Sequence, residues 1–198
     1  MTVILTDEEL VEDVKKGNID AFEDIVKKYE NKVYGIVFHM MKNQNEVEDL
    51  AQEVFLKVYK NLDRFKGDSS LYTWIYKITV NLCLDELKKR KNIIYLDEKI
   101  NVEDGEIDKE LPSNERSQEE LYEDKELKEN LHRCINKLPD KQKMMIVLRD
   151  IKGFSYDEIA KITNNKIGTV KSQINRARLK LKELLDKEGT FLEYIVSK

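Results

Sequence analysis

Proline and glycine are scarce in this chain of 198 residues, which contains 2 Pro and 7 Gly. These two residues interrupt helices most strongly, so few positions in the chain disfavour a helix. Charged residues make up 37% of the chain, and apolar residues recur at intervals of three and four almost throughout. Such spacing is typical of amphipathic helices. Composition and spacing together predict an all-α, soluble protein.

Long apolar runs are also missing. The first ten residues, MTVILTDEEL, hold too short an apolar run for a secretory signal peptide. A helix that spans a membrane needs about 20 predominantly apolar residues in a row. No segment of this sequence approaches that length. We therefore expect a cytoplasmic protein whose chain is not inserted in a membrane.

Soft metal ligands and nucleophiles are few. Cys83 and Cys134 are the two cysteines, and His39 and His132 are the two histidines. His132 and Cys134 stand two residues apart, so on a helix they point in different directions and form no zinc-type spacing. The sequence predicts two reduced structural thiols, with a redox or zinc switch as an unsupported alternative. Neither a paired nucleophile and base nor a phosphate-binding loop is visible, so we expect no cofactor and no enzymatic activity.

Two short helices around a polar turn are predicted in the stretch 154–181. Ser155 and Glu158 have the spacing of a capping box, which marks the start of the first helix, and Asn164 and Asn165 end it. The second helix carries apolar residues predicted to face the core, namely Ile167, Val170, Ile174, Ala177 and Leu181. This is the arrangement of a helix-turn-helix that enters the major groove of DNA.

The outward face of that second helix is cationic. Residues 161–182 contain seven Lys or Arg and no Asp or Glu, although the net charge of the whole chain is −4. Cations neutralise phosphates, and hydroxyl, amide and guanidinium groups can bond phosphates and base edges. A solvated basic face is the alternative, but capping box, turn and apolar stripe together favour DNA binding. The candidate DNA-binding residues are Thr169, Lys171, Ser172, Asn175, Arg176 and Arg178.

Four further helices are predicted in the first half of the chain. The first follows a capping box at Thr6 and Glu9, and the others cover about 22–40, 47–62 and 71–90. Four polar residues of the third helix fall on or beside its outward face, within reach of one partner surface. An ordinary solvated face would have the same pattern. These residues are Asp49, Gln52, Glu53 and Lys57.

The fourth helix begins with aromatic residues and ends with the cations KKRK. Tyr72, Trp74 and Tyr76 lie near Phe65, and aromatic rings beside cations can hold unstacked bases. We expect Trp74 to pack in the core, because large aromatic side chains are usually mostly buried. Tyr72 and Tyr76 are predicted to be exposed.

An acidic segment separates the two halves. Residues 97–126 hold 13 Asp or Glu against 4 Lys or Arg and show no sustained apolar stripe, which predicts a flexible linker. We expect a helical domain at residues 1–92, the linker at 93–121 and a second helical domain at 122–188. The tail at 189–198 is predicted to be either a short extra helix or a frayed end.

Two stretches of the sequence resemble the two domains of bacterial extracytoplasmic-function (group 4) sigma factors of the sigma-70 family. They are DLAQEVFLKVYKNLDRFKGDSSLYTWIYKITVNLCLDELKKRK and LPDKQKMMIVLRDIKGFSYDEIAKITNNKIGTVKSQINRARLKL. The resemblance covers nearly everything except the linker and the last ten residues. It implies a four-helix sigma-2-like domain followed by a sigma-4-like helix-turn-helix domain. It also implies a subunit that directs RNA polymerase to promoters.

The resemblance further implies roles for the candidate residues. Asp49, Gln52, Glu53 and Lys57 would bind core RNA polymerase, and the outward residues of the helix-turn-helix would read the minus-35 duplex. The implied partners are core polymerase, promoter DNA as duplex and as single non-template strand, and an anti-sigma factor, often membrane-anchored. The residues implied in melting and capturing the minus-10 element are Arg64, Lys66, Tyr72, Trp74, Tyr76, Lys77, Asn81 and Lys88.

The sequence departs from the family at Lys166, where Pro is frequent, and at Gln173 and Asn175, where Arg and His are frequent. The minus-35 sequence of other members therefore does not transfer to this chain. Two other classes of function fit parts of the sequence. One is a freestanding helix-turn-helix regulator that never docks on polymerase, and the other is a helical adaptor without a nucleic-acid role.

Overall fold

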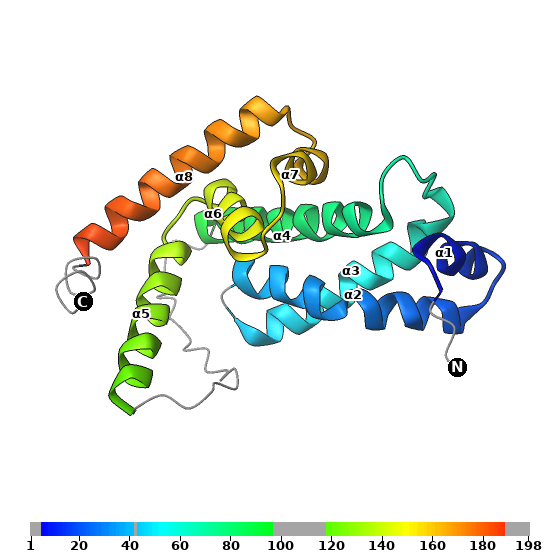
Figure 1. Cartoon of the computed structure of the whole chain (residues 1–198), viewed down its shortest axis with the longest axis horizontal. Coiled ribbons are helices and arrows are strands. Elements are labelled where there is room, and N and C mark those ends of the chain that lie inside the picture. The colour runs from blue at the N-terminus through cyan, green and yellow to red at the C-terminus, as the bar shows by residue number, and fades with distance from the viewer. Residues whose placement is uncertain (1–4, 42, 97–117, 189–198) are drawn as a thin grey trace.

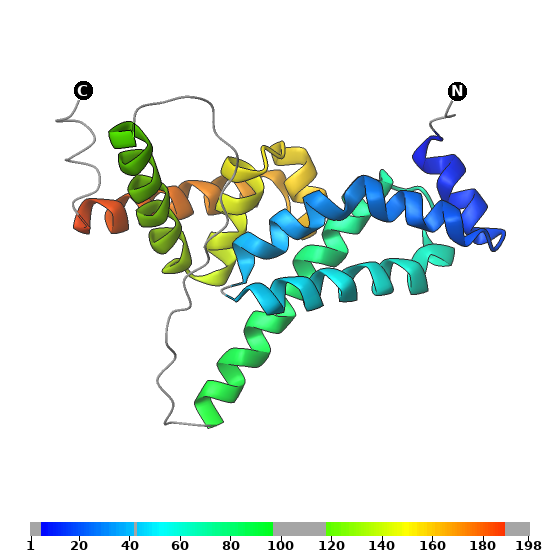
Figure 2. The same cartoon turned by 90° about the horizontal axis from the view of Figure 1, so that it is seen from below.

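The first four helices lie together and form what we call the N-terminal unit, residues 5–96 (Figure 1). The computed structural model describes residues 5–41, 43–96 and 118–188. The unit consists of α1 (Asp7–Lys15), α2 (Ile19–Met40), α3 (Gln44–Asn61), the short 3-10 turn η1 (Leu62–Arg64) and α4 (Leu71–Leu96). Figure 2 shows α2 and α3 side by side, α4 running obliquely across them, and α1 across one end.

The apolar stripes predicted for this half are confirmed. Ile25, Val33 and Val37 of α2 and Val54 and Val58 of α3 are fully buried against one another. The capping box of α1 is present, because the Glu9 amide donates to Thr6 Oγ1 and the Thr6 amide donates to the Glu9 carboxylate. The spacing of these residues was therefore sufficient to locate the helices.

The C-terminal unit, residues 118–188, contains the predicted helix-turn-helix. Its helices are α5 (Gln118–Asn136), α6 (Asp140–Ile146), α7 (Tyr156–Thr163) and α8 (Ile167–Lys187), and a five-residue π-helical turn, η2 (Val147–Ile151), follows α6. The predicted capping box is confirmed, since the Glu158 amide donates to Ser155 Oγ at 3.2 Å. Asn164 ends α7 in the left-handed conformation, with φ of 52°. That conformation turns the chain into α8.

The two units pack against each other, which the sequence analysis did not predict. Helix α7 packs across α4, and α6 lies against α4 and the end of α2 (Figures 1 and 2). One continuous set of buried apolar residues runs through both units. The two helical domains are therefore held together by direct packing as well as by the chain that joins them.

The expected linker is shorter than predicted. Helix α4 continues to Leu96 and α5 begins at Gln118, so residues 93–96 and 118–121 are helical rather than part of a linker. The helix had not been expected to pass Arg90. The rest of the predicted linker, 97–117, and the tail at 189–198 lie outside the described residues. In the described ranges we find no strand, and no helix there is long and apolar enough to cross a membrane.

Candidate nucleic-acid interface

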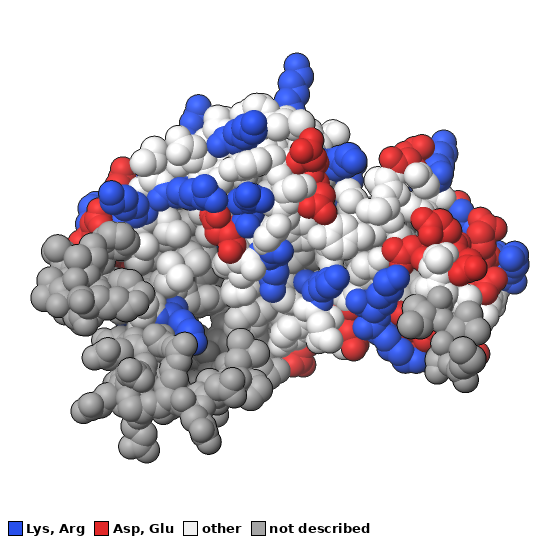
Figure 3. Space-filling view, in the orientation of Figure 1, with Lys and Arg blue, Asp and Glu red and all other residues white. Residues whose placement is uncertain are grey.

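The outward face of α8 presents the predicted polar and cationic side chains to solvent. Its inward face buries Val170, Ile174 and Ala177, which fixes the rotation of the helix. Ile167 was predicted to be in the core but is 41% exposed, because the first residue of α8 precedes the contact with α6 and α7. Lys and Arg side chains line the edge of the molecule where α8 runs (Figure 3). The exposed residues are Thr169, Lys171, Ser172, Asn175, Arg176 and Arg178.

Some of these side chains already have partners within the C-terminal unit. Arg178 is paired with Asp150 of η2, and its Nε donates to Asp150 Oδ2 at 3.1 Å. The Ser172 hydroxyl donates to the Thr169 carbonyl at 2.9 Å. Lys171 Nζ lies 5.7 Å from the centre of the Tyr156 ring. Arg178 therefore has to exchange a carboxylate for a phosphate before it can contact DNA, and the sequence alone did not reveal that competition.

The start of α8 carries no side-chain cap. Lys166 occupies the N-cap position, and its side chain makes no capping hydrogen bond. The first amides of an uncapped helix have no intrahelical acceptor, and together with the helix dipole they favour an anion such as a phosphate. The next residues, Ile167, Gly168 and Thr169, are exposed. This end of the helix is thus open to a DNA backbone.

A second exposed face lies on α3. Asp49, Gln52, Glu53 and Lys57 are all exposed, as predicted. Leu56, which was not predicted to belong to this face, is 59% exposed between two of these polar residues. The sequence offered one signal for this exposure, because Leu56 lies off the apolar stripe of α3. Val54 and Val58, two residues before and after it, occupy the buried positions. Leu56 gives this charged face an apolar centre.

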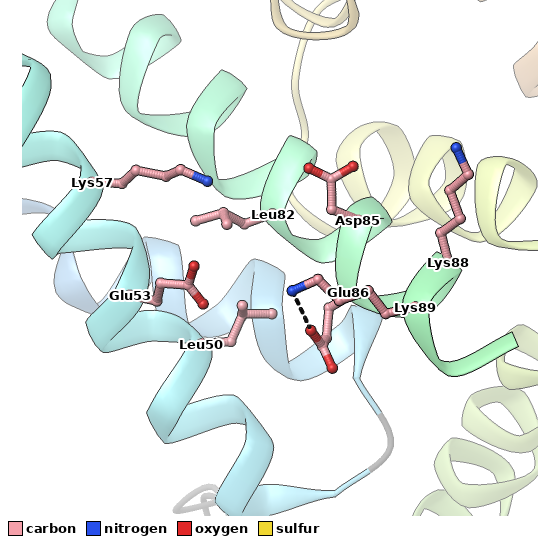
Figure 4. Close-up of a pocket in the computed structure, with 8 residues that line it drawn as sticks. All are labelled: Leu50, Glu53, Lys57, Leu82, Asp85, Glu86, Lys88 and Lys89. Carbon is pink, nitrogen blue, oxygen red and sulfur yellow. Dashed lines mark hydrogen bonds and ion pairs between the residues drawn. The ribbon is translucent and has the colours of Figure 1, made fainter. Parts of the chain in front are cut away.

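A shallow cavity of about 330 Å³ lies between α3 and α4 (Figure 4). Its floor is apolar, because Leu50 and Leu82 are 6% and 5% exposed. The rim is charged, and Lys89 pairs there with Glu86 at 3.4 Å. The cavity is lined by residues from two predicted binding sites. Glu53 and Lys57 are predicted to bind polymerase, and Lys88 is predicted to bind DNA. The lining residues are Leu50, Glu53, Lys57, Leu82, Asp85, Glu86, Lys88 and Lys89.

Phe65 anchors the start of the segment predicted to capture unstacked bases. Lys15, the last residue of α1, donates from its Nζ to the Phe65 carbonyl at 3.0 Å. Phe65 begins the loop that joins η1 to α4. The Phe65 ring lies 5.3 Å from the Trp74 ring, centre to centre. Trp74 is partly buried against the core, close to the expected core position. The exposed residues of this set are Arg64, Lys66, Lys77, Asn81 and Lys88.

The predicted exposure of Tyr76 is wrong. Tyr76 is 1% exposed, and Tyr72 is only partly exposed. The Phe154 ring of the C-terminal unit lies 5.4 Å from the Tyr72 ring and 5.2 Å from the Tyr76 ring. Burial raises the pKa of Tyr72 to about 12, and the nearby Glu158 carboxylate adds to that rise. The C-terminal unit covers this part of α4, which is why an analysis of α4 alone misjudged it.

The cysteines are buried and unpaired. Cys83 and Cys134 are free thiols in the interior of the two units. Burial raises the pKa of Cys83 to about 12, so this thiol stays protonated and unreactive at neutral pH. No group of three or more His, Cys, Asp or Glu is placed to hold a metal ion within the ranges that the structure covers.

Comparison with known proteins identifies both units. Residues 25–93 match the family described as Sigma-70 region 2, and residues 128–181 match Sigma-70, region 4. The first match covers the exposed face of α3 and nearly all of α4. The second covers the helix-turn-helix. The two regions thus stand in the order in which the sequence analysis placed the two domains.

Relatives align over almost their whole length. The ECF RNA polymerase sigma factor SigW of Bacillus subtilis is 38% identical over 176 residues, which cover 88% of this chain and 94% of SigW. The ECF RNA polymerase sigma-E factor of Escherichia coli is 39% identical over 183 residues, covering 90% and 93% of the two chains. A solved structure, the sigma factor RpoE in complex with the anti-sigma factor NepR from Bartonella quintana, matches with a TM-score of 0.67 and 25% identity over 83% of this chain and 96% of that one.

Both regions are matched in order, and the relatives cover about nine-tenths of the chain. The matched regions contain the helix-turn-helix with its exposed cationic helix and the exposed charged face of α3. This chain belongs to the extracytoplasmic-function sigma factors of the sigma-70 family.

Proposed function

We propose that this sigma factor directs core RNA polymerase to promoters by placing its two units on two separate DNA elements. The exposed cationic face of α8 carries this proposal, because it lies on the second helix of a helix-turn-helix, the element that reads a major groove. The C-terminal unit would read the minus-35 duplex through Thr169, Lys171, Ser172, Asn175, Arg176 and Arg178. A sigma factor supplies no bond chemistry, so the protein is not an enzyme.

The N-terminal unit would supply the polymerase contact. Asp49, Gln52, Glu53 and Lys57 form a charged exposed face, and Leu56 provides an apolar centre that water leaves on binding. The cavity between α3 and α4 adds a recess beside this face. A surface of this kind fits a protein partner better than it fits DNA, because its carboxylates would repel phosphates.

Strand capture would belong to the loop after η1 and to α4. Arg64, Lys66, Lys77, Asn81 and Lys88 are exposed and can hold the non-template strand. Tyr72, Trp74 and Tyr76 would supply aromatic faces for unstacked bases once the C-terminal unit moves away. Binding only the single strand stabilises the melted promoter, because a ligand shifts an equilibrium by its differential affinity for the two states.

The proposal includes two further expectations. A related solved structure holds the sigma factor RpoE in complex with the anti-sigma factor NepR, so we expect an anti-sigma partner for this chain, in a form that is either free or anchored in the membrane. We also expect the protein to act in the cytoplasm, where polymerase and promoters are. Neither expectation depends on the residue assignments above.

Transcription reconstituted from purified core polymerase tests the proposal. The wild-type chain should form a stable complex with core and direct transcripts from a specific subset of genomic promoters. Glu53→Lys should lose core binding, and the double variant Lys171→Ala with Arg176→Ala should keep core binding but lose promoter choice. Lys187→Ala, an exposed lysine at the far end of α8, serves as the matched control. A chain that selects promoter DNA without binding core would instead be a freestanding regulator.

A further inference from the structure

Residues 65–70, which we call the capture loop, join η1 to α4 beside α1 (Figure 1). The end of the loop is fixed by Ser70, whose Oγ accepts a hydrogen bond from the Thr73 amide at 3.2 Å and lies 2.9 Å from Thr73 Oγ1. Between the two ends, residues 66–68 are exposed, and Gly67 turns the chain with φ of 79°. The conformation of this exposed middle therefore depends on how the two ends of the loop are held.

The start of the capture loop is held from another helix. Lys15, the last residue of α1, donates from its Nζ to the carbonyl of Phe65, which lies 50 residues further along the chain. Helix α1 also contacts η1 directly. The Phe65 ring in turn packs against Trp74 in the first turn of α4. We call the hydrogen bond from Lys15 to Phe65 the Lys15 brace.

Helix α1 is itself anchored to α2, so the Lys15 brace connects the capture loop to the core of the N-terminal unit. Leu10 of α1 is buried, at 3% exposed. In the first turn of α1, the Asp7 carboxylate accepts hydrogen bonds from Lys28 Nζ at 2.8 Å and from the Tyr29 hydroxyl at 2.6 Å. Asp7 thus ties the start of α1 to α2, and Lys15 ties its end to the loop.

A brace of this kind lowers the cost of binding an unpaired base. A loop that is free before binding loses conformational freedom when a ligand orders it, and that loss reduces the affinity. A hydrogen bond that is already present in the free protein orders the loop before the strand arrives. Because the bond is made to the backbone carbonyl of Phe65, this effect needs no contact between Lys15 and DNA.

We propose that Lys15 is a positioning residue for strand capture, and that its hydrogen bond to Phe65 holds the capture loop and the Trp74 ring in the conformation that receives an unpaired base. The proposal rests on the proposed function for the identity of the ligand, which is the single non-template strand. The brace itself is a property of the free chain and can be measured there.

Two neighbouring lysines provide a matched pair of variants. Lys15→Met removes the donor and keeps an unbranched side chain, and Lys16→Met makes the same change one residue later. Lys16 pairs with Asp13 of α1 at 3.5 Å and serves as the control. Lys15→Arg keeps a charged donor and should restore whatever Lys15→Met loses.

Holoenzyme binding to a forked promoter measures strand capture. The fork leaves the minus-10 segment of the non-template strand unpaired, and its sequence comes from a promoter that the wild-type holoenzyme transcribes. Lys15→Met should lower the affinity for the fork about three- to tenfold, which corresponds to the loss of one hydrogen bond. Its affinity for the same promoter as full duplex should not change. Lys16→Met should change neither affinity, and equal affinity of the two variants for the fork would overturn the proposal.

The salt dependence of fork binding separates positioning from a direct phosphate contact. A cation that neutralises a phosphate of a single strand contributes about 0.7 to the slope of log affinity against log salt concentration. Lys15→Met should have the same slope as Lys16→Met, because the brace does not contact the strand. A slope that is lower by about 0.7 in Lys15→Met would overturn the proposal, since Lys15 would then bind the strand itself.

Hydrogen exchange in the free chain tests the brace without polymerase or DNA. The amides of Phe65 and Thr73 donate hydrogen bonds at the two ends of the capture loop, so their exchange reports local opening there. Exchange should be faster in Lys15→Met than in Lys16→Met, and equal exchange would contradict the brace. If the wild-type holoenzyme does not prefer the fork to the duplex, the proposed function fails, while hydrogen exchange still decides whether Lys15 holds the loop.

Discussion

At the scale of single residues, Asn164 is the position where the backbone makes the strongest demand. It adopts φ of 52° and ψ of 44°, a left-handed conformation that Gly and Asn accept and that other residues adopt at a cost of about 1–2 kcal/mol. Its amide donates to the Ala160 carbonyl and closes the last turn of α7. The geometry of the helix-turn-helix therefore depends on this one residue type.

We expect Asn164→Gly to leave stability unchanged or slightly raised and Asn164→Val to lower the free energy of unfolding by about 1–2 kcal/mol, because a β-branched residue resists positive φ. Urea unfolding followed by circular dichroism measures both. Lys161→Val, at an exposed position inside α7, controls for the helix propensity of valine, worth about 0.5 kcal/mol. Equal unfolding midpoints for the Asn164→Gly and Asn164→Val variants would contradict the argument.

A second residue-scale prediction concerns phosphate contacts. Each cation that neutralises a phosphate contributes close to one unit to the dependence of log affinity on log salt concentration. Lys171→Ala and Arg176→Ala should each weaken duplex binding by the holoenzyme and lower that slope by about 1. Because Arg178 is paired with Asp150, Asp150→Asn should instead strengthen binding. Binding titrations at several salt concentrations provide the slopes, and unchanged slopes in both alanine variants would exclude these contacts.

At the scale of elements, α3 has one face that packs in the core and an opposite face that is exposed. Its apolar stripe was predictable, since Val47, Val54 and Val58 recur at helical spacing and are fully buried. The polar outward face was predictable as a face, but its use was not, because a solvated helix and a docking helix carry the same polar residues. The 59% exposed Leu56 adds an apolar group to that polar face, and its substitution tests whether a partner covers it.

Leu56→Glu should lower affinity for core polymerase at least tenfold, which is about 1.4 kcal/mol, because a charge would replace the apolar centre of the docking face. Its 59% exposure means that the free energy of unfolding should change by no more than about 0.5 kcal/mol. Ile19→Glu is the matched control, since Ile19 is 63% exposed on the first turn of α2. Surface plasmon resonance with immobilised core separates the two outcomes. Equal affinity of both variants would remove Leu56 from the interface.

At the scale of the whole molecule, the arrangement of the two units could not be predicted from the sequence. Helix periodicity and capping boxes are local signals, and they located most helices and the turn at Asn164. Phe154 and Tyr76 are far apart in sequence, and their contact produces no periodic pattern from which it could be predicted. The lack of any sequence signal for contacts between the units also explains the wrong prediction for Tyr76, which is covered by the other unit.

The junction of the units should also make stability depend on pH. His39 faces His132 of α5, Lys143 of α6 and Lys152 beyond η2, and it packs on Phe38. Burial, with those positive charges, lowers the pKa of His39 to about 4, against 6.5 for an ordinary histidine. Burial and Lys143 also lower the pKa of His132. Both imidazoles are therefore held neutral where the units meet.

The direction of this pH dependence follows from whether the folded or the unfolded chain binds the proton of His39. Well above pH 6.5 His39 is neutral in both states and contributes no pH dependence. Between about pH 6.5 and 4 the unfolded chain is protonated and the folded chain is not, so stability falls as the pH falls. Thermal unfolding across this range should show the loss, and His39→Gln should reduce its slope. A slope identical to that of the wild-type chain would contradict the assignment.

Trp74 is the single tryptophan of a chain with nine tyrosines, and it stands at the loop predicted to hold the melted strand. Its indole rests on the Phe65 ring, whose backbone carbonyl is in turn held by Lys15. Selective excitation of tryptophan in the free chain therefore gives an optical signal from this one place in the molecule without any added label. With the tryptophans of core polymerase replaced by a non-fluorescent analogue, stopped-flow fluorescence can thus time strand capture separately from the arrival of the duplex at α8.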